Sequence, residues 1–316
     1  MPLPTINDVQ AVEPILQNLL VGYQQSDERF VASRVFPGVA VDKDSGTYYI
    51  FTKKYWFRTE MEQRAPGQQY PRADFGTETS TYATLQWALS VPLADEVKAN
   101  SQIPMSLEEA ATRWLAQQSL LRKEISFGAD FMVTGVWGTD DNNSATDWDD
   151  FSSGDPVNDL FTAKRTVSNG TGVDPNTMVL GYIVHQALMN HPDIIDRIKY
   201  TQAATQASIE QALGAVLGFE RYLVGKAVYS NTNESAAFSS TSIIDDDCLV
   251  AYVTPNPGLF EASAGYTFHW AAGGGLGMVK PVLREEAHDA DLVRIKEQWD
   301  QKAVATDVGY FFADIV

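Results

Sequence analysis

The sequence predicts an α+β fold built around one long helix, and three patterns support this prediction. Apolar residues recur at threes and fours from Leu107 to about Val133, which indicates a helix roughly 40 Å long at 1.5 Å per residue. Before this helix, apolar and polar residues alternate from Tyr82 to Val91, which is the period of a strand. After it, residues 278–315 return to extended patterns.

Residues 1–41 are expected to form an N-terminal arm. Short apolar groups in this segment are separated by Pro14, Gly22, Pro37 and Gly38. Such a segment has little core of its own, so we expect it to lie along a neighbouring surface.

Residues 42–99 are expected to form an extended hairpin loop. The outgoing limb is aromatic from Thr47 to Phe57, and the return limb is the alternating stretch that ends at Val91. The stretch between the limbs, residues 60–79, is rich in Gln, Gly, Pro and Arg and has no apolar face to bury locally. The tip of the hairpin therefore calls for a partner surface.

Cations and aromatic residues are interleaved in this hairpin, although the chain as a whole has a net charge of -18. Aromatic and arginine enrichment is typical of protein interfaces. Docking onto an acidic neighbouring subunit is the favoured interpretation; a nucleic-acid surface and an ordinary charged hairpin are the alternatives. The candidate interface residues are Lys53, Lys54, Trp56, Arg58, Arg64, Tyr70 and Arg72.

Ser106 and Glu109 predict the start of the long helix, because they have the spacing of a capping box. In this motif each side chain satisfies the other residue's backbone donor. Between Asp140 and Asp159 lie seven aspartates and no Lys or Arg, which predicts a solvated loop. Residues 171–280 then read as a mixed α/β region, with strands expected near Met178, Tyr222 and Cys248 and helices near Val184, Pro192 and Ser208.

The closing residues 281–316 predict an antiparallel meander that pairs with strands from earlier in the chain. We expect its partners to be the bases of the hairpin. The extended stretches are Met278 to Arg284, Leu292 to Lys296, Lys302 to Thr306 and Tyr310 to Ile315.

Several classes of protein are disfavoured by composition. No run of eighteen apolar residues exists and the N-terminus lacks a secretion signal, so we expect neither a membrane protein nor an exported one. Cys248 is the single cysteine, which excludes an internal disulfide. The acidic charge disfavours a surface that grips nucleic acid, yet it suits a wall that encloses a polyanion.

No catalytic motif is present in the sequence. It contains no Gly-x-Ser-x-Gly, no His-Glu-x-x-His, no phosphate-binding loop and no cysteine pair for zinc. His185 and His191 are six residues apart and so do not share a helix face, and the glycine run 273–277 lacks nucleotide-loop spacing. We therefore expect no enzyme activity, no metal and no cofactor.

The order of arm, hairpin, long capped helix, α/β region and closing strands resembles the major capsid proteins of tailed double-stranded DNA bacteriophages, a fold shared with encapsulins. The resemblance covers essentially the whole chain. The closing stretch is similar in style to the terminal strands of that family, through Val293, Arg294, Ile295, Trp299, Lys302, Val304, Gly309, Tyr310 and Phe311.

The resemblance implies a peripheral domain at residues 100–170, with a long spine helix and antiparallel strands completed by residues 281–316. It also implies an axial α/β domain at residues 171–280 and a hairpin that overlaps the adjacent subunit. Pentamers and hexamers would then close an icosahedral shell around the phage DNA.

The implied partners are further copies of the chain, portal and scaffolding proteins and possibly decoration proteins. The DNA would be enclosed without sequence-specific binding, and no membrane would be involved. The protein would belong to the virion capsid and be assembled in the host cytoplasm. An encapsulin-like compartment shell, an α/β enzyme with an unrecognised site and a nucleic-acid-binding protein are the alternatives.

Overall fold

The computed structural model describes residues 24–316, except for residues 52, 75, 101–106, 142–146, 199–212, 233–236, 258–260, 274 and 277. The helices are η1 (Asp27–Arg29), α2 (Ala32–Val35), α3 (Lys53–Trp56), α4 (Asp95–Asn100), α5 (Leu107–Phe131), α6 (Pro156–Thr171), α7 (Tyr182–Asn190), α8 (Pro192–Ile198), η2 (Ala271–Gly273) and η3 (Thr306–Val308). The strands are β1 (Gly38–Val41), β2 (Ser45–Phe51), β3 (Thr77–Ala83), β4 (Leu85–Ala94), β5 (Thr139–Asp141), β6 (Thr177–Gly181), β7 (Arg221–Gly225), β8 (Val228–Tyr229), β9 (Thr241–Ser242), β10 (Cys248–Ala251), β11 (Gly265–Trp270), β12 (Met278–Glu285), β13 (Ala290–Ala303) and β14 (Gly309–Phe312).

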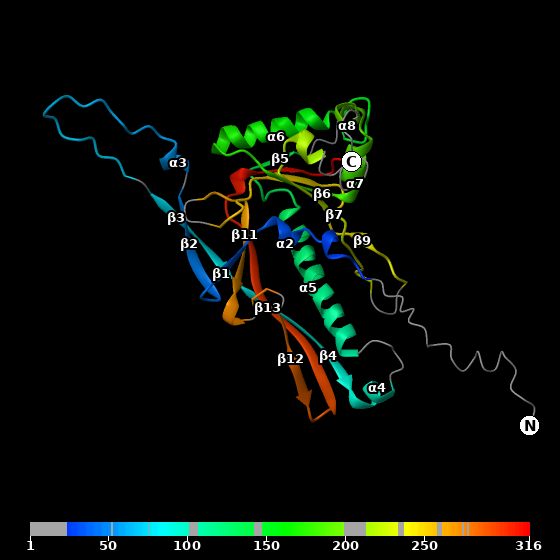
Figure 1. Ribbon diagram of the computed structural model, residues 1–316. Coiled ribbons are helices and arrows are strands. Elements are labelled where there is room, and N and C mark those ends of the chain that lie inside the picture. The colour runs from blue at the N-terminus through cyan, green and yellow to red at the C-terminus, as the bar shows by residue number, and fades with distance from the viewer. Residues whose placement is uncertain are drawn as a thin grey trace, which may run out of the picture.

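A long sheet is centred on β13 (Figure 1). On one edge, residues Ala290 to Trp299 of β13 pair antiparallel with the whole of β4. On the other edge, β12 and β11 pair antiparallel with successive parts of β13. Strand β1 adds to β11 in parallel. The prediction that the closing residues pair with the base of the hairpin is confirmed by the pairing of β13 with β4.

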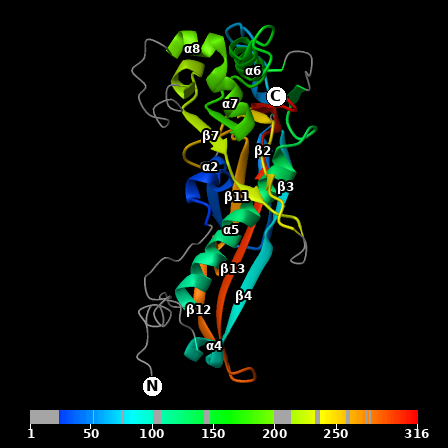
Figure 2. The ribbon, with the colours of Figure 1, turned by 90° about the vertical axis from the view of Figure 1, so that its right-hand side faces the viewer.

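The spine helix α5 lies along the long sheet (Figure 2). It ends within two residues of its predicted limit, whereas the predicted cap residue Ser106 lies outside the described residues. The lower part of the helix packs Leu115 against Val293 and Ile295 in a small apolar cluster. From β4, Leu93 and Val91 take part in this cluster. Further along β4, Trp87 stacks on Trp299 with ring centroids 5.8 Å apart.

Two consecutive buried ionisable residues fasten the middle of α5 on two sides. Lys123 is 7% exposed and its Nζ lies 3.2 Å from Oε1 of Glu297 on β13. Glu297 is also bonded by the hydroxyl of Ser119 and, at 3.0 Å, by the indole of Trp299. Glu124 faces the arm, where its carboxylate accepts hydrogen bonds from the backbone amides of Val31 and Ala32.

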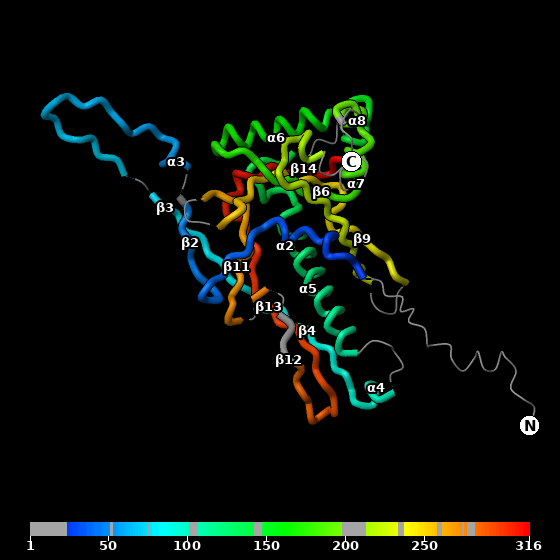
Figure 3. Tube along the Cα trace, viewed as in Figure 1, coloured from blue at the N-terminus to red at the C-terminus, as the bar shows by residue number. Residues whose placement is uncertain are grey.

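Residues 30–36, which we call the buried arm segment, cross α5 beside Glu124 (Figure 3). Phe30, Val31, Ala32, Val35 and Phe36 are each at most 1% exposed. The ring of Phe36 packs edge-on against two aromatic rings of α5, at 5.6 and 5.0 Å. This part of the predicted arm is therefore integral to the core, while residues 1–23 lie outside the described residues.

A second sheet has the order β5-β14-β10-β6-β7. Every residue of β6, β10 and β14 is buried, because α6 lies over one face and α7 packs against β6 and β7 (Figure 1). Helix α6 is capped at its start by Asp155, which accepts a hydrogen bond from the amide of Asn158 at 3.0 Å. The single cysteine, Cys248, is fully buried in this sheet, and burial raises its pKa.

Two details differ from the sequence expectations. Strand β14 leaves the other closing strands and pairs with β10 in the second sheet, so the C-terminus connects both sheets. The aspartate-rich segment is not wholly solvated: Trp148 is fully buried, stacks near Phe312 at 5.4 Å, and donates its indole hydrogen to Asp159 at 3.1 Å. One aromatic side chain thus anchors an otherwise charged segment.

We predict that Lys123→Met destabilises the subunit by about 3–5 kcal/mol, because the carboxylate of Glu297 would remain buried without its cation. The double variant Lys123→Met/Glu297→Met should recover most of that loss, because no unpaired charge remains. Urea unfolding of the unassembled chain measures both. A single variant as stable as the double variant would contradict the prediction.

Candidate inter-subunit interface

The hairpin extends well beyond the body of the protomer (Figures 1 and 3). Its base is formed by β2 and β3, which pair antiparallel from Ser45↔Ala83 to Phe51↔Thr77. The base rests on the long sheet through stacking of Tyr82 on Phe268, with ring centroids 4.8 Å apart. Tyr48 approaches the same ring at 5.6 Å.

The segment that follows β2 is anchored to the protomer's own body at two points. Lys53 in α3 forms an ion pair with Asp307 of η3 at 2.9 Å, and both side chains are about half exposed. The ring of Phe57 lies near Gly172, the residue that caps α6 with a left-handed φ of 70°. Tyr55 crosses to the other limb, where it leaves no room for a side chain at Gly76. These contacts fix the base of the hairpin on the body of its own protomer.

The tip beyond these anchors, residues 58–74, is exposed at every position. Two of its contacts are local: Arg58 pairs with Glu60 at 3.3 Å, and the guanidinium of Arg64 lies 4.1 Å from the centre of the Tyr70 ring. Arg64 also donates to the carbonyl of Gln68 at 2.7 Å. The tip therefore presents an arginine stacked on an aromatic ring with no core beneath it.

The structure brings the predicted interface residues together on this one projection, in two groups. Lys53, Lys54 and Trp56 lie on α3 near the base, whereas Arg58, Arg64, Tyr70 and Arg72 lie on the tip. The sequence reasoning missed three strongly exposed apolar side chains on the same projection, and their exposure could not be read from the pattern. These are Tyr49 at 71%, Phe57 at 61% and Met61 at 92% exposed.

A surface with a net negative charge lies at the other end of the protomer (Figure 1). We call α4 and the turn between β12 and β13 the acidic end. Arg284 binds Asp95 through two contacts of 2.7 Å, and this pairing lowers the pKa of Asp95. Carboxylates still outnumber cations there: Asp95, Glu96, Glu285, Glu286, Asp289 and Asp291 face Arg284 and Lys98.

Hairpin tip and acidic end are too far apart on one protomer to meet (Figure 1). Contact between them therefore requires two copies of the chain. The tip is neutral overall, because Arg58, Arg64 and Arg72 are balanced by Glu60, Glu62 and Asp74. Its arginines, together with Lys53 and Lys54 of α3, are the groups whose charge is opposite to that of the acidic end.

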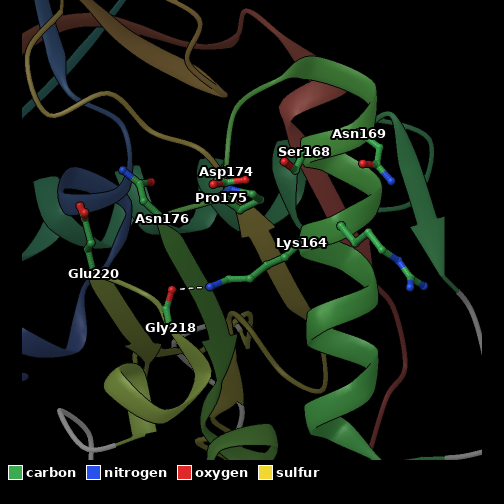
Figure 4. Close-up of a pocket in the computed structure, with 9 residues that line it drawn as sticks. Lys164, Ser168, Asn169, Asp174, Pro175, Asn176, Gly218 and Glu220 are labelled. Atoms are coloured by element: carbon green, nitrogen blue, oxygen red, sulfur yellow. Dashed lines mark hydrogen bonds between the residues drawn. The ribbon is translucent and has the colours of Figure 1, made fainter.

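A pocket of about 430 Å³ opens between α6 and the strand ends of the second sheet (Figure 4). Lys164 points into it, yet its ammonium is bound to the carbonyls of Leu217 and Gly218, and burial lowers its pKa. The same group lies 4.0 Å from the centre of the Phe219 ring. Lys164 therefore fastens α6 to the chain before β7, and the pocket residues form no nucleophile and base pair.

Neither a metal site nor a membrane-spanning helix occurs among the described residues. In that part of the chain, no cluster of three or more His, Cys, Asp or Glu side chains could hold a metal ion. No described helix is long and apolar enough to cross a bilayer. His185 and His191 are both buried and serve packing: His185 bonds the Tyr222 hydroxyl at 2.9 Å, and His191 bonds the Gly154 carbonyl at 3.1 Å.

A spine helix on a long sheet, a second helix-covered sheet and a projecting hairpin define the subunit of a viral capsid. The comparisons with known proteins agree. The family model described as phage major capsid protein E matches residues 110–267, which is half of the chain. The chain therefore belongs to the phage major capsid protein E family, and its role is structural, as a component of the capsid shell.

Individual proteins show the same similarity. The chain is 26% identical over 321 residues to the major capsid protein of Burkholderia phage BcepMu, covering 98% of both chains. A crystal structure of a phage-related protein from Bordetella bronchiseptica RB50 is 25% identical, with a TM-score of 0.68 over 93% of this chain and 94% of that chain. The mature capsid of bacteriophage PhiM1 shares the fold at 11% identity, with a TM-score of 0.58 over 94% and 89%.

We predict that Arg64→Glu and Tyr70→Ala change the stability of the isolated subunit by less than about 0.5 kcal/mol, because exposed surface positions contribute little to folding. Thermal denaturation of the unassembled chain measures this. A large loss of stability in either variant would mean that the tip is part of the protomer's own core.

Proposed function

We propose that copies of this capsid protein associate into pentamers and hexamers, and that the hairpin tip of one copy binds the acidic end of an adjacent copy. The observation that carries this proposal is the exposed tip, where arginine and aromatic side chains project without local burial. Buried arginine and aromatic anchors dominate the energetics of interfaces. A second copy supplies both the apolar cover and the opposite charge.

In this proposal each part of the subunit has its own structural role. Within residues 42–99, the hairpin from β2 to β3 overlaps the neighbour, whereas β4 belongs to the protomer's own long sheet. The spine helix and the long sheet form a peripheral domain, and the second sheet, with its helices, forms an axial domain. This division differs from the predicted ranges 100–170, 171–280 and 281–316, because β11 lies in the long sheet whereas α6 and β14 lie with the second sheet. Residues 1–41 form an arm; among its described residues, the buried arm segment and β1 are bound to their own protomer.

The shell is proposed to enclose the phage DNA without reading its sequence. The net charge of -18 supports this, because an acidic wall repels phosphates and leaves the packed polymer free to slide. Portal, scaffolding and possibly decoration proteins are the proposed partners, with assembly in the host cytoplasm. An encapsulin-like compartment would use the same subunit contacts and differ in its cargo.

Assembly of the purified chain tests the contact made by the tip. We expect Arg64→Glu/Arg72→Glu to weaken each contact at least tenfold, about 1.4 kcal/mol or more, because two cations would face carboxylates with the wrong sign. Electron microscopy and sedimentation measure the fraction in shells. The matched control is Arg113→Glu, an exposed reversal on α5 away from the hairpin; equal yields from all three proteins would contradict the proposal.

The acceptor surface has its own test. Glu285→Lys/Glu286→Lys should reproduce the assembly defect of the tip variant. If this variant assembles normally while the tip variant does not, the tip binds a different surface of the neighbour. If the wild-type subunit instead binds DNA tightly, with affinity falling steeply as salt rises, the nucleic-acid interpretation of the hairpin is correct.

A further inference from the structure

Glu124 has an unusual environment for a carboxylate. It is 0% exposed, and its oxygens accept hydrogen bonds from the amide of Val31 at 3.1 and 2.9 Å and from the amide of Ala32 at 2.8 Å. Within the described part of the chain, no ion pair joins it to a cation. A buried charge held by amides alone is costly compared with its neutral form.

The charged groups around Glu124 come from three elements. Arg34 of α2 is exposed and donates to the carbonyl of Glu28 at 3.5 Å. Arg221 of β7 reaches the carbonyl of Val35 at 3.5 Å. Lys123, the preceding residue of α5, is turned about 100° around the helix axis and pairs with Glu297 of β13. Because guanidinium groups stay cationic in proteins, Glu124 is the group here that can change its charge.

We propose that docking of the buried arm segment onto α5 is coupled to proton uptake by Glu124, so that the segment opens more readily as the pH rises. The groups that couple docking to protonation are the buried carboxyl of Glu124 and the two backbone amides that it binds. The coupling requires no second copy of the chain.

The sign of the coupling follows from burial. Burial raises the pKa of Glu124 to about 7 from an ordinary 4.5, and it outweighs the opposing influence of the two amides and of Arg34. When the segment opens, water reaches the carboxyl and its pKa returns toward the ordinary value. The docked state thus binds more protons between pH 4.5 and about 7, and it loses stability relative to the open state as the pH rises through this window.

The hydrogen bonds explain why the segment remains docked when Glu124 is neutral. Oε2 receives the shorter contacts, 2.9 Å from Val31 and 2.8 Å from Ala32, whereas Oε1 receives only the longer contact of 3.1 Å. A proton on Oε1 therefore leaves both amides bonded to Oε2. Ionisation of Glu124 places a charge in a site shielded from water, and it adds no further hydrogen-bond donor to stabilise that charge.

Hydrogen exchange of the full chain tests the proposal at the two amides themselves. The amides of Val31 and Ala32 should exchange more readily as the pH rises from about 5 to about 8, after correction for the chemical exchange rate. Because each pKa unit corresponds to a tenfold change, the fall in protection should be on the order of 100-fold. Protection that stays constant across this range would overturn the proposal.

Variants identify the group responsible. In Glu124→Gln the protection of the segment should no longer depend on pH, since the side chain cannot ionise. The matched control Glu109→Gln removes an exposed carboxylate of the same helix and should keep the wild-type dependence. A dependence that persists in Glu124→Gln would assign the coupling to another group. Should that variant not fold, the pH titration of the Glu124 carboxyl in the wild-type chain by NMR decides: a carboxyl that is already ionised at pH 5 in the docked state would overturn the proposal.

Discussion

The subunit depends on how the middle of α5 is held. Lys123 and Glu124 are adjacent in sequence, so the helix turns their side chains about 100° apart, toward β13 and toward the arm. Both contacts are buried, so neither is weakened by competing water. The long helix is thereby fixed between a strand from the end of the chain and a segment from its beginning. Folding must therefore bring both ends together before the core is complete.

The two sheets are connected in the same way. Strand β11 pairs with β13 although its neighbour in sequence, β10, belongs to the second sheet, and β14 returns from the long sheet to β10. The chain thus crosses between the sheets more than once. Such crossings connect the two halves of the protomer covalently, and they leave the hairpin as the one large described projection not bound into either sheet.

Local patterns predicted the elements better than their partners. The spine helix was predictable because its apolar spacing extends over many turns. The alternation in β4 correctly indicated a strand, but alternation shows which face is apolar and not which strand lies alongside. The partner of β14 depends on a contact with β10 far away in sequence.

The burial of Trp148 was hidden by the aspartates around it, because a single aromatic residue has no period. The exposed tip was predictable since its few apolar residues follow no helical or strand period, whereas its acceptor requires knowledge of the whole surface.

The burial of Cys248 in the second sheet has a practical consequence for labelling. It is the only thiol in the chain and is 0% exposed, so maleimide and other thiol reagents should find no accessible native target in the folded protein. A cysteine introduced at Met61, which is 92% exposed at the tip, would then be a unique attachment point for a fluorophore or spin label. Spectroscopy could follow that probe alone while every other position stays chemically silent.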